Sequence, residues 1–318
     1  MSSVRHDALL QKEDLRAIES VLYEPVKKEL TARQFMHVNS SFVPYAQEIG
    51  YDWYSMKGSA KILAAGGSAK DVPFVGEDGG RETQKVYDII TGIRYTRTER
   101  MAVAARNSLG KGPTVSLDMI RVTTARRFVA ETENKIAFVG DKDHKIQGLL
   151  NFTGIKTEDV AGGANGSTVQ EKRKWSNKTP QEILKDLLAG RTEAKQKKLF
   201  KANVLLISSN AYNQLLKPFS DLSDKTVLDW LRGQQDFKFE QILECEELDK
   251  EYNKISGDVD VFCICDNRPE VLELAIVEDL TLGEPVYDLI GTSEMTVTER
   301  IGGIILRHPT SVYIGKGI

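Results

Sequence analysis

Residues 116–137 are the longest uninterrupted helical candidate in the sequence, because the run contains neither glycine nor proline. At ~1.5 Å per residue, such a helix would be on the order of 30 Å long, about the width of a small domain. A shorter helical pattern over residues 98–109 ends at the Gly-Lys-Gly-Pro loop of residues 110–113. We therefore expect a long helix that serves as a spine for the structure around it.

Residues 83–97 carry the two-residue period of a half-buried strand. One face holds Tyr87, Ile89, Ile93 and Tyr95, and the other holds Asp88, Arg94 and Thr96. Turn-rich sequence precedes this run from residue 60 onward, so we interpret the segment as a long two-stranded ribbon. Because a ribbon of two strands is barely stable alone in water, it must lie on the body of the protein or on a neighbouring subunit.

The N-terminal residues have the pattern of an arm. Apolar residues recur at helical spacing over residues 13–22, and Pro25 ends this short amphipathic helix. Residues 35–54 mix aromatic and polar side chains without a sustained period, which indicates an extended segment. An extended aromatic arm usually needs a partner surface to lie on.

Two further segments follow the predicted spine helix. Residues 138–155 have the pattern of a hairpin-like strand pair, with Gly140 and the polar cluster of residues 141–144 as its turn. Residues 162–178 are rich in glycine, serine, asparagine and basic residues, and we expect an exposed and mobile loop there.

A compact α/β part begins at Thr179. The sequence Thr-Pro-Gln-Glu is a helix-start signature, with Pro180 at the first helical position and Glu182 three residues after the cap. Strand and helix patterns then alternate, which is typical of an α/β arrangement. The strands are expected over residues 204–208 and 259–265, and the helices over residues 210–217 and 223–231.

Strands close the chain from residue 293 onward. The pair Gly302-Gly303 suggests a bulge, and Pro309 suggests an edge or a turn. Together with the helices and strands of the first half, these patterns predict an α+β fold.

Composition limits the classes of function. The formal net charge is -3, so no global positive field recruits nucleic acid, and contact with DNA would be local and weak. No apolar run approaches the roughly 20 residues that span a bilayer, and the polar N-terminus lacks the apolar core of a signal peptide. An odd count of three cysteines without framework spacing fits a reducing compartment. We expect a protein that stays in the cytoplasm where it is made.

The sequence contains none of the common catalytic motifs, neither GxSxG, HExxH, GxxxxGK[ST] nor GxGxxG after a strand. Cys263 and Cys265 share one face of a predicted strand and are interpreted as buried core thiols rather than as a metal pair. Residues 141–145 resemble the start of a calcium loop but lack its glycine and its closing glutamate, so a polar turn is preferred. None of the four histidines lies beside a nucleophile in the sequence. We predict no enzyme activity, cofactor or metal site.

The order of these parts resembles the fold of tailed-phage major capsid proteins, the Hong Kong 97 type, which encapsulin nanocompartments share. The resemblance is carried by KDVPFV and the strand up to Arg97, by RRFVAETENKIAFVGD running into QGLLNFTGI, and by ERIGGIILRHPTSVYIGKGI. It covers most of the chain from about Val38 onward.

The resemblance implies a division into four parts: an N-terminal arm, an extended β-hairpin loop, a peripheral domain with the spine helix, and an α/β axial domain. Their expected ranges are residues 1–55 for the arm, 56–97 for the extended loop, 98–178 with 286–318 for the peripheral domain, and 179–285 for the axial domain. It also implies a subunit that self-assembles, as hexamers and pentamers, into the icosahedral head shell around phage double-stranded DNA. Scaffolding, portal and decoration proteins are the further partners implied, and the virion capsid is the implied location.

A succession of charges of both signs follows the predicted ribbon. We interpret these charges as candidates for setting register between subunits, against the alternative of a solvated face. The candidate interface residues are Arg81, Glu82, Lys85, Arg94, Arg97 and Glu99. Basic residues at 172–174 and 194–201 are interpreted as polar surface, with packaged DNA as the alternative, because no aromatic platform accompanies them.

The family performs one reaction, a self-catalysed Lys–Asn isopeptide crosslink between subunits that a Glu assists. Lys61, Lys70 and Lys85 lie on the predicted extended loop, but no motif identifies a reactive trio. We predict no covalent crosslink.

Two other functions stay open at this point. An encapsulin-type nanocompartment shell has the same fold but encloses a protein cargo. A soluble α/β enzyme with an unrecognised site belongs to another class.

Overall fold

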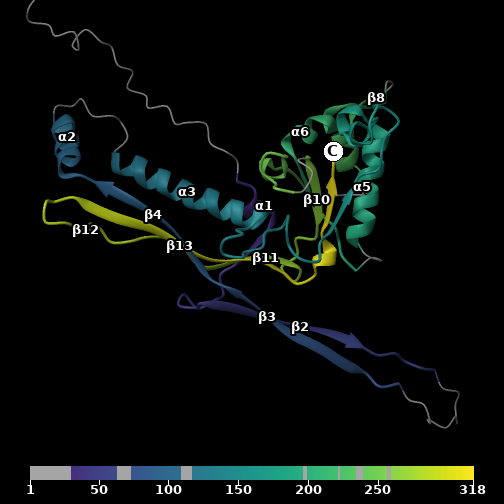
Figure 1. The fold of residues 1–318 in the computed structure, drawn as a ribbon, viewed down its shortest axis with the longest axis horizontal. Helices are drawn as coiled ribbons and strands as arrows, with labels where there is room; N and C mark the ends of the chain where they lie inside the picture. Colours follow the sequence, from purple (N-terminus) through teal and green to yellow (C-terminus); the bar gives the residue numbers. More distant parts are fainter. Residues whose placement is uncertain are drawn as a thin grey trace, which may run out of the picture. The chain divides into compact units, whose positions relative to one another are not determined.

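The computed structural model describes residues 30–62, 73–108, 117–195, 199–220, 223–233, 239–255 and 259–318. The predicted helix over residues 13–22 and the predicted loop over residues 110–113 lie outside these ranges. The chain divides into two units (Figure 1). One contains Met1–Lys28, Thr91–Phe128 and Leu282–Val297, and the other contains Glu29–Ile90, Val129–Thr281 and Thr298–Ile318.

The two predicted helices that follow the ribbon are confirmed. Helix α2 spans Arg97–Ser108, and helix α3 spans Leu117–Val139, which makes α3 the 23-residue spine that the absence of glycine and proline indicates. Nearly all side chains in the last two turns of α3 are buried, including Asn134, Ala137 and Phe138, while Lys135 is exposed. The end of this helix therefore belongs to the core.

The first sheet has five strands. Its order is β1-β11-β13-β12, with β4 also paired to β13. The strands are β1 (His37–Asn39), β4 (Tyr87–Tyr95), β11 (Leu272–Leu282), β12 (Val286–Tyr287) and β13 (Ser293–Leu306). The predicted alternation along residues 87–95 is confirmed, because Ile93 and Tyr95 are buried while Asp88 and Arg94 are exposed.

The second sheet is built from strands far apart in the sequence, in the order β5-β14-β10-β6-β9. They are β5 (Lys156–Asp159), β6 (Val204–Ile207), β9 (Gln241–Glu244), β10 (Val261–Cys265) and β14 (Tyr313–Lys316). The predicted strands over residues 204–208 and 259–265 are thus confirmed. Both are fully buried, which explains their continuous apolar sequence.

Helices cover one side of the second sheet. Helix α5 (Pro180–Lys195) begins at the predicted cap, where the Thr179 N–H and hydroxyl donate to the Glu182 carboxylate at 2.8 and 3.0 Å. Its buried face, including Ile183 and Leu187, packs in one cluster with Phe262 and Tyr313 of the sheet. The other helices here are α6 (Ser209–Tyr212), η3 (Asn213–Leu216) and α7 (Val227–Gly233).

A two-stranded ribbon is present, but its strands differ from the prediction. Strand β2 (Glu48–Lys57) pairs antiparallel with β3 (Gly76–Lys85) over the whole of both strands, from Glu48 opposite Lys85 to Lys57 opposite Gly76. The first strand begins inside the predicted arm, and the run 83–97 is two strands rather than one, because β4 leaves the ribbon and joins the first sheet. No residue of β3 is buried, so the ribbon has no core of its own.

Short elements complete the described chain. They are α1 (Ala32–Phe35), α4 (Val169–Arg173), η2 (Trp175–Asn177), β7 (Pro218–Ser220), β8 (Ser223–Thr226), η4 (Glu246–Leu248) and η5 (Pro309–Ser311). The predicted helix over residues 223–231 is right only in its second half, since Ser223 lies in β8. The cap is Thr226, whose hydroxyl donates to Asp229 at 2.8 Å.

The predicted strand pair over residues 138–155 is wrong, because these residues close the end of α3 instead. The N–H groups of Leu149 and Leu150 donate to the carbonyls of Ala137 and Phe138, both at 2.8 Å. Asn151 donates to the Val139 carbonyl at 2.8 Å and accepts from the Gly148 N–H at 2.7 Å. Carbonyls that a helix end leaves without partners are thereby satisfied. Only an isolated bridge between Asp141 and Ile146 has strand character.

The predicted exposed loop over residues 162–178 is also partly wrong. Thr168 and Glu171 form a capping box that begins α4. Trp175 is fully buried, and its Nε1 donates to the Asp186 carboxylate of α5 at 3.0 Å. The buried Lys178 ammonium pairs with the same carboxylate. This anchor fixes the segment onto α5.

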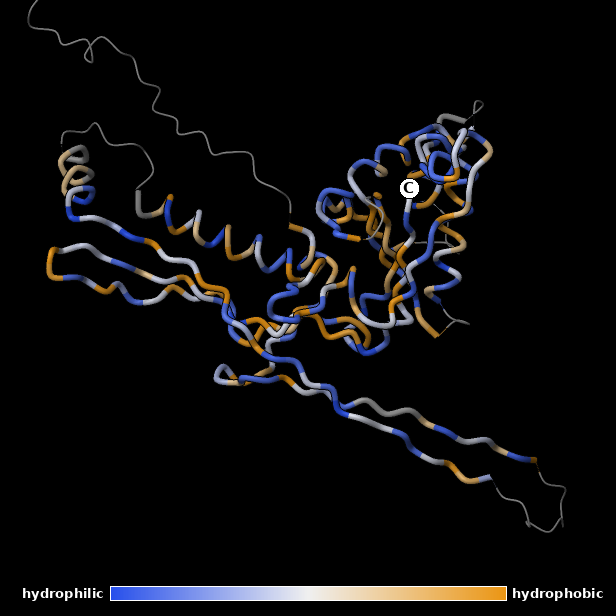
Figure 2. The backbone as a smooth tube through the Cα atoms, in the orientation of Figure 1, coloured by the Kyte–Doolittle hydropathy of each residue, from blue (hydrophilic) through white to orange (hydrophobic). Residues whose placement is uncertain are grey.

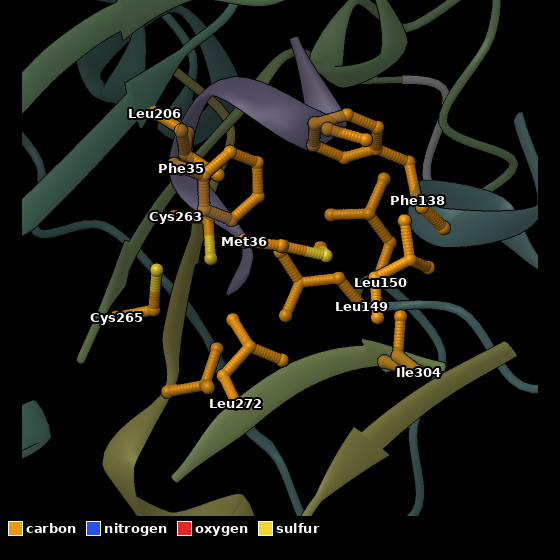
Figure 3. Close-up of a cluster of buried hydrophobic side chains, with 14 of the residues drawn as sticks. Phe35, Met36, Phe138, Leu149, Leu150, Leu206, Cys263, Cys265, Leu272 and Ile304 are labelled. Atoms are coloured by element: carbon orange, nitrogen blue, oxygen red, sulfur yellow. The ribbon is translucent and has the colours of Figure 1, made fainter. Parts of the chain in front are cut away.

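The central core joins both sheets to α1 and to the end of α3. Figure 3 shows Phe35 and Met36 of α1 and its C-cap among Phe138, Leu149 and Leu272. Cys245, Cys263 and Cys265 are free thiols in this same cluster, which confirms that they are core residues. Burial raises the pKa of Cys245 to about 12, so this thiol stays protonated.

We expect Asn151→Ala to lower the free energy of unfolding by about 1–2 kcal/mol, because it removes both hydrogen bonds that tie the turn to the end of α3. Denaturant unfolding of the unassembled chain measures this loss. Asn165→Ala is the matched control, since Asn165 makes one exposed hydrogen bond to the Asn177 carbonyl at 3.2 Å. An equal loss in both variants would contradict the assigned role of Asn151.

Candidate assembly surfaces

The candidate charges on the ribbon are paired across it. Arg81 donates to the opposite Asp52 at 2.6 and 2.8 Å, and the Tyr51 hydroxyl donates to the opposite Glu82 at 2.6 Å. The Arg81 guanidinium lowers the pKa of the Asp52 carboxyl. Because these residues face each other in the register of β2 and β3, their pairs align the two strands of one chain. Lys85 ends β3 and is exposed.

The candidates of β4 and α2 are also largely engaged within the chain. Arg94 donates from Nε to Glu294 of β13 at 2.6 Å. Glu99 accepts from Arg121 of α3 at 2.7 Å and caps α2 together with Thr96. The Arg121 guanidinium, with the Thr96 donors, lowers the pKa of Glu99 to about 2. Arg97, the first residue of α2, is exposed.

The predicted interface residues are divided between the two units. Arg81, Glu82 and Lys85 lie in the unit that contains the ribbon, whereas Arg94, Arg97 and Glu99 lie in the other unit. Four of them have partners in their own chain, which sequence reasoning could not find. Their partners are remote in sequence, as with Arg94 and Glu294.

Sequence reasoning missed an apolar surface at the open end of the ribbon. Met56, Ile62, Phe74 and Val75 are all exposed, Ile62 to 98% and Phe74 to 89%. Figure 2 shows hydrophobic colour at this end of β2 and β3. Exposed apolar area costs roughly 25 cal/mol per Å² relative to burial, so a cluster of this kind is a candidate contact surface.

A second apolar surface is the turn between β12 and β13, residues 286–292, which we call the apolar turn. Its exposed side chains are Val286, Tyr287, Leu289 and Ile290, and Leu289 is as exposed as in an extended chain, at 107%. Figure 2 shows this turn in hydrophobic colour. Four apolar side chains among five consecutive residues are too many for chance exposure on a folded surface.

Hydrogen bonds hold the apolar turn in one shape. The Asp288 carboxylate accepts from the N–H groups of Thr292 at 2.7 Å and Ile290 at 3.0 Å, which lowers the pKa of Asp288. Gly291 has a φ of +84°, a conformation that favours glycine. Arg100 lies 5.4 Å from the centre of the Tyr287 ring and donates to the Gly291 carbonyl. Leu289 and Ile290 are thus presented by a fixed backbone.

Among the residues that the structure describes, no group of three or more His, Cys, Asp or Glu side chains could hold a metal ion. The interpretation of residues 141–145 as a polar turn is confirmed, with His144 paired to Asp141. Of the helices in the described chain, none has the length and apolar character to cross a bilayer.

Solved structures with this fold are shell proteins. The chain is similar to the capsid of Myoviridae Phage XM1, with a TM-score of 0.78 at 13% identity over 98% of this chain and 100% of that chain. The capsid of a native GTA particle matches with a TM-score of 0.63 at 12% identity over 99% and 98% of the two chains. A virus-like particle from Pyrococcus furiosus matches with a TM-score of 0.55 at 17% identity over 89% and 90%. A search of curated proteins returned no match.

A two-stranded ribbon, a spine helix and an α/β part, in this order along the chain, define the Hong Kong 97-type fold of shell-forming proteins. The predicted α+β class and fold type are therefore confirmed. Residues 58–318 match the model of the major capsid protein family, and the chain belongs to that family. It is a capsid subunit that self-associates into a shell.

Proposed function

We propose that the chain assembles as hexamers and pentamers into the icosahedral head shell that encloses the double-stranded DNA of a tailed phage. The observation that carries this proposal is the exposed apolar end of the ribbon, Met56, Ile62, Phe74 and Val75. A ribbon of two strands has no second layer to cover such side chains. Because a shell surrounds each subunit with identical neighbours, a second copy of the chain is the surface that covers them.

We keep the division into four parts as part of this proposal. The arm comprises residues 1–55, the extended loop 56–97, the peripheral domain 98–178 with 286–318, and the axial domain 179–285. In this division the ribbon and the apolar turn belong to different domains. Each subunit would then have two apolar contacts with its neighbours at separate places.

Among the candidate interface charges, Lys85 and Arg97 are favoured to meet a neighbouring subunit. Arg81, Glu82, Arg94 and Glu99 already have partners within the chain. Charges at an interface set register and exclude wrong partners more than they add affinity. We therefore assign register, rather than strength of association, to this pair.

Scaffolding, portal and decoration proteins remain proposed partners, and synthesis in the host cytoplasm is the proposed origin of the subunit. Contact with packaged DNA would be weak and nonspecific, given the net charge of -3. We assign the chain no catalytic activity and no cofactor. Its proposed role is to associate with other protein subunits.

Reversing two charges tests the register hypothesis. We expect Lys85→Glu with Arg97→Glu to lower the yield of particles by about tenfold or more, because the loss of ~1.4 kcal/mol at a subunit contact suffices for that factor. Gradient sedimentation and electron microscopy measure the yield, and circular dichroism should show a folded monomer. The control is Arg94→Glu with Glu294→Arg, which restores the pair within the chain and leaves Lys85 and Arg97 in place. Wild-type yield from the double reversal would remove the hypothesis.

Polar substitutions test the apolar turn. We expect Leu289→Ser with Ile290→Ser to abolish particles, because each substitution removes about 1.5–3 kcal/mol of favourable burial at a contact. The unassembled chain should keep its unfolding midpoint, because both side chains are exposed before assembly. Val169→Ser is the matched control, since Val169 is also exposed, at 67%, but lies in α4. Normal particles from the turn variant would show that this surface is not a subunit contact.

A denaturing gel of purified particles tests the expected absence of crosslinks. Lys61 and Lys85 are exposed, and Lys70 lies outside the described residues. We expect one band at the mass of the 35.5 kDa chain. A ladder of multimers would contradict this expectation.

A compartment of the encapsulin type is the second candidate function, favoured by the likeness to a virus-like particle. The contents of purified particles distinguish the phage head from the compartment. Double-stranded DNA in the particle supports the phage head, and a protein cargo supports the compartment. Gel filtration excludes the soluble enzyme alternative if the protein elutes as a megadalton particle.

A further inference from the structure

One arginine of helix α1 forms ion pairs with three carboxylates. Arg33 donates to Glu133 of α3 at 2.7 to 3.0 Å, to Asp279 of β11 at 3.0 Å and to Glu299 of β13 at 2.8 Å. All four residues belong to the unit that contains the ribbon. Three acids from three elements thus meet a single cation.

The excess of negative charge has a high desolvation cost, because two of the carboxylates are buried. Glu133 is 3% exposed and Glu299 is 1% exposed, whereas Asp279 remains largely in solvent. Within the described ranges, Oε2 of Glu299 has no hydrogen-bond partner. Two buried carboxylates cannot both stay ionised beside one shared arginine without a large desolvation cost. The geometry therefore requires a proton on the pair.

The proton belongs on Glu299. Burial, and then the charge and hydrogen bond of Glu133, raise the pKa of Glu299 to about 8, although Arg33 opposes the shift. Arg33 lowers the pKa of the more exposed Asp279. Asn134, the residue after Glu133, donates to Glu247 of η4 at 2.8 Å.

This cluster fastens the point at which the N-terminal segment joins the body. The N–H groups of Thr31 and Ala32 donate to Oδ1 of Asn134 at 3.2 and 2.9 Å. Phe35 and Met36 lie in the core beside Phe138, as Figure 3 shows. Residues 31–36 are therefore held by α3, β11 and β13 together, with Arg33 at the centre.

We propose that Glu299 is a proton-controlled clasp that sets how firmly residues 31–36 are held. When the clasp opens, water reaches the carboxyl and its affinity for the proton returns to the ordinary value. The closed form then binds one proton more than the open form between about pH 4.5 and pH 8. Proton linkage then requires the equilibrium constant for closing to fall about tenfold for each pH unit of rise in that window. Above the window the constant falls no further. The clasp is thus tightest in mild acid.

Hydrogen exchange in the unassembled full chain tests the clasp. At pH 5.5 and pH 8, after correction for intrinsic rates, we expect peptides covering residues 31–39 of the wild type to lose about 100-fold in protection. Glu299→Gln should remove this loss, because an amide cannot ionise. Glu294→Gln, on the same strand but paired with Arg94, is the matched control and should keep the wild-type response. Peptides from β10 should stay protected at both pH values, which separates clasp opening from global unfolding.

Two results would overturn the proposal: protection in the wild type that does not change with pH, or an unchanged loss in Glu299→Gln. If Glu299→Gln does not fold, Glu133→Gln replaces it, since removal of the neighbouring charge should shrink the loss below about tenfold. An undiminished loss in that variant would equally reject the clasp. The inference goes beyond the proposed shell and does not rest on it, because every measurement uses the unassembled chain.

Discussion

The end of helix α3 is the point on which the larger unit of the structure depends. Its last carbonyls are satisfied by the turn at residues 148–151, and its buried side chains join the core between the two sheets. Asn134 and Glu133 on the same turns hold residues 31–36. Helix termination, core packing and attachment of the N-terminal segment therefore share a few consecutive residues.

Other parts of the chain have no comparable support. No side chain of β3 is buried, and the apolar turn leaves four large side chains in solvent. A monomeric protein would be expected to cover such surfaces or replace them by polar residues. On a chain of the major capsid protein family, such surfaces are the ones that contacts between subunits would cover.

Local patterns in the sequence were sufficient for elements whose burial is regular. The absence of glycine and proline predicted α3, alternation predicted β4, and the Thr179 signature predicted the start of α5. Strand β2 was not predicted, because its buried positions Ile49 and Tyr51 pack against β11 and β13, and two positions are too short a pattern to detect. The turn after α3 was misjudged because a short apolar run fits a strand as well as a helix-capping turn.

Contacts between remote residues were beyond the reach of such patterns. The clasp unites residues 33, 133, 279 and 299, and the pairing of β1 with β11 joins positions more than 200 residues apart. The interface candidates were chosen as charges along the predicted ribbon, whereas most of these charges pair with residues of their own chain. The exposed apolar residues were visible as letters in the sequence, but their exposure follows only from the three-dimensional structure.

The fixed shape of the apolar turn bears on how a shell avoids defects. If a neighbour docks on the apolar turn as proposed, little ordering remains for the contact to impose, because Asp288 and Gly291 already hold the backbone. A few apolar side chains give an association of only a few kcal/mol, so a wrongly placed subunit can dissociate. In a closed lattice many such contacts act together, so the assembled particle would be stable although each contact is weak.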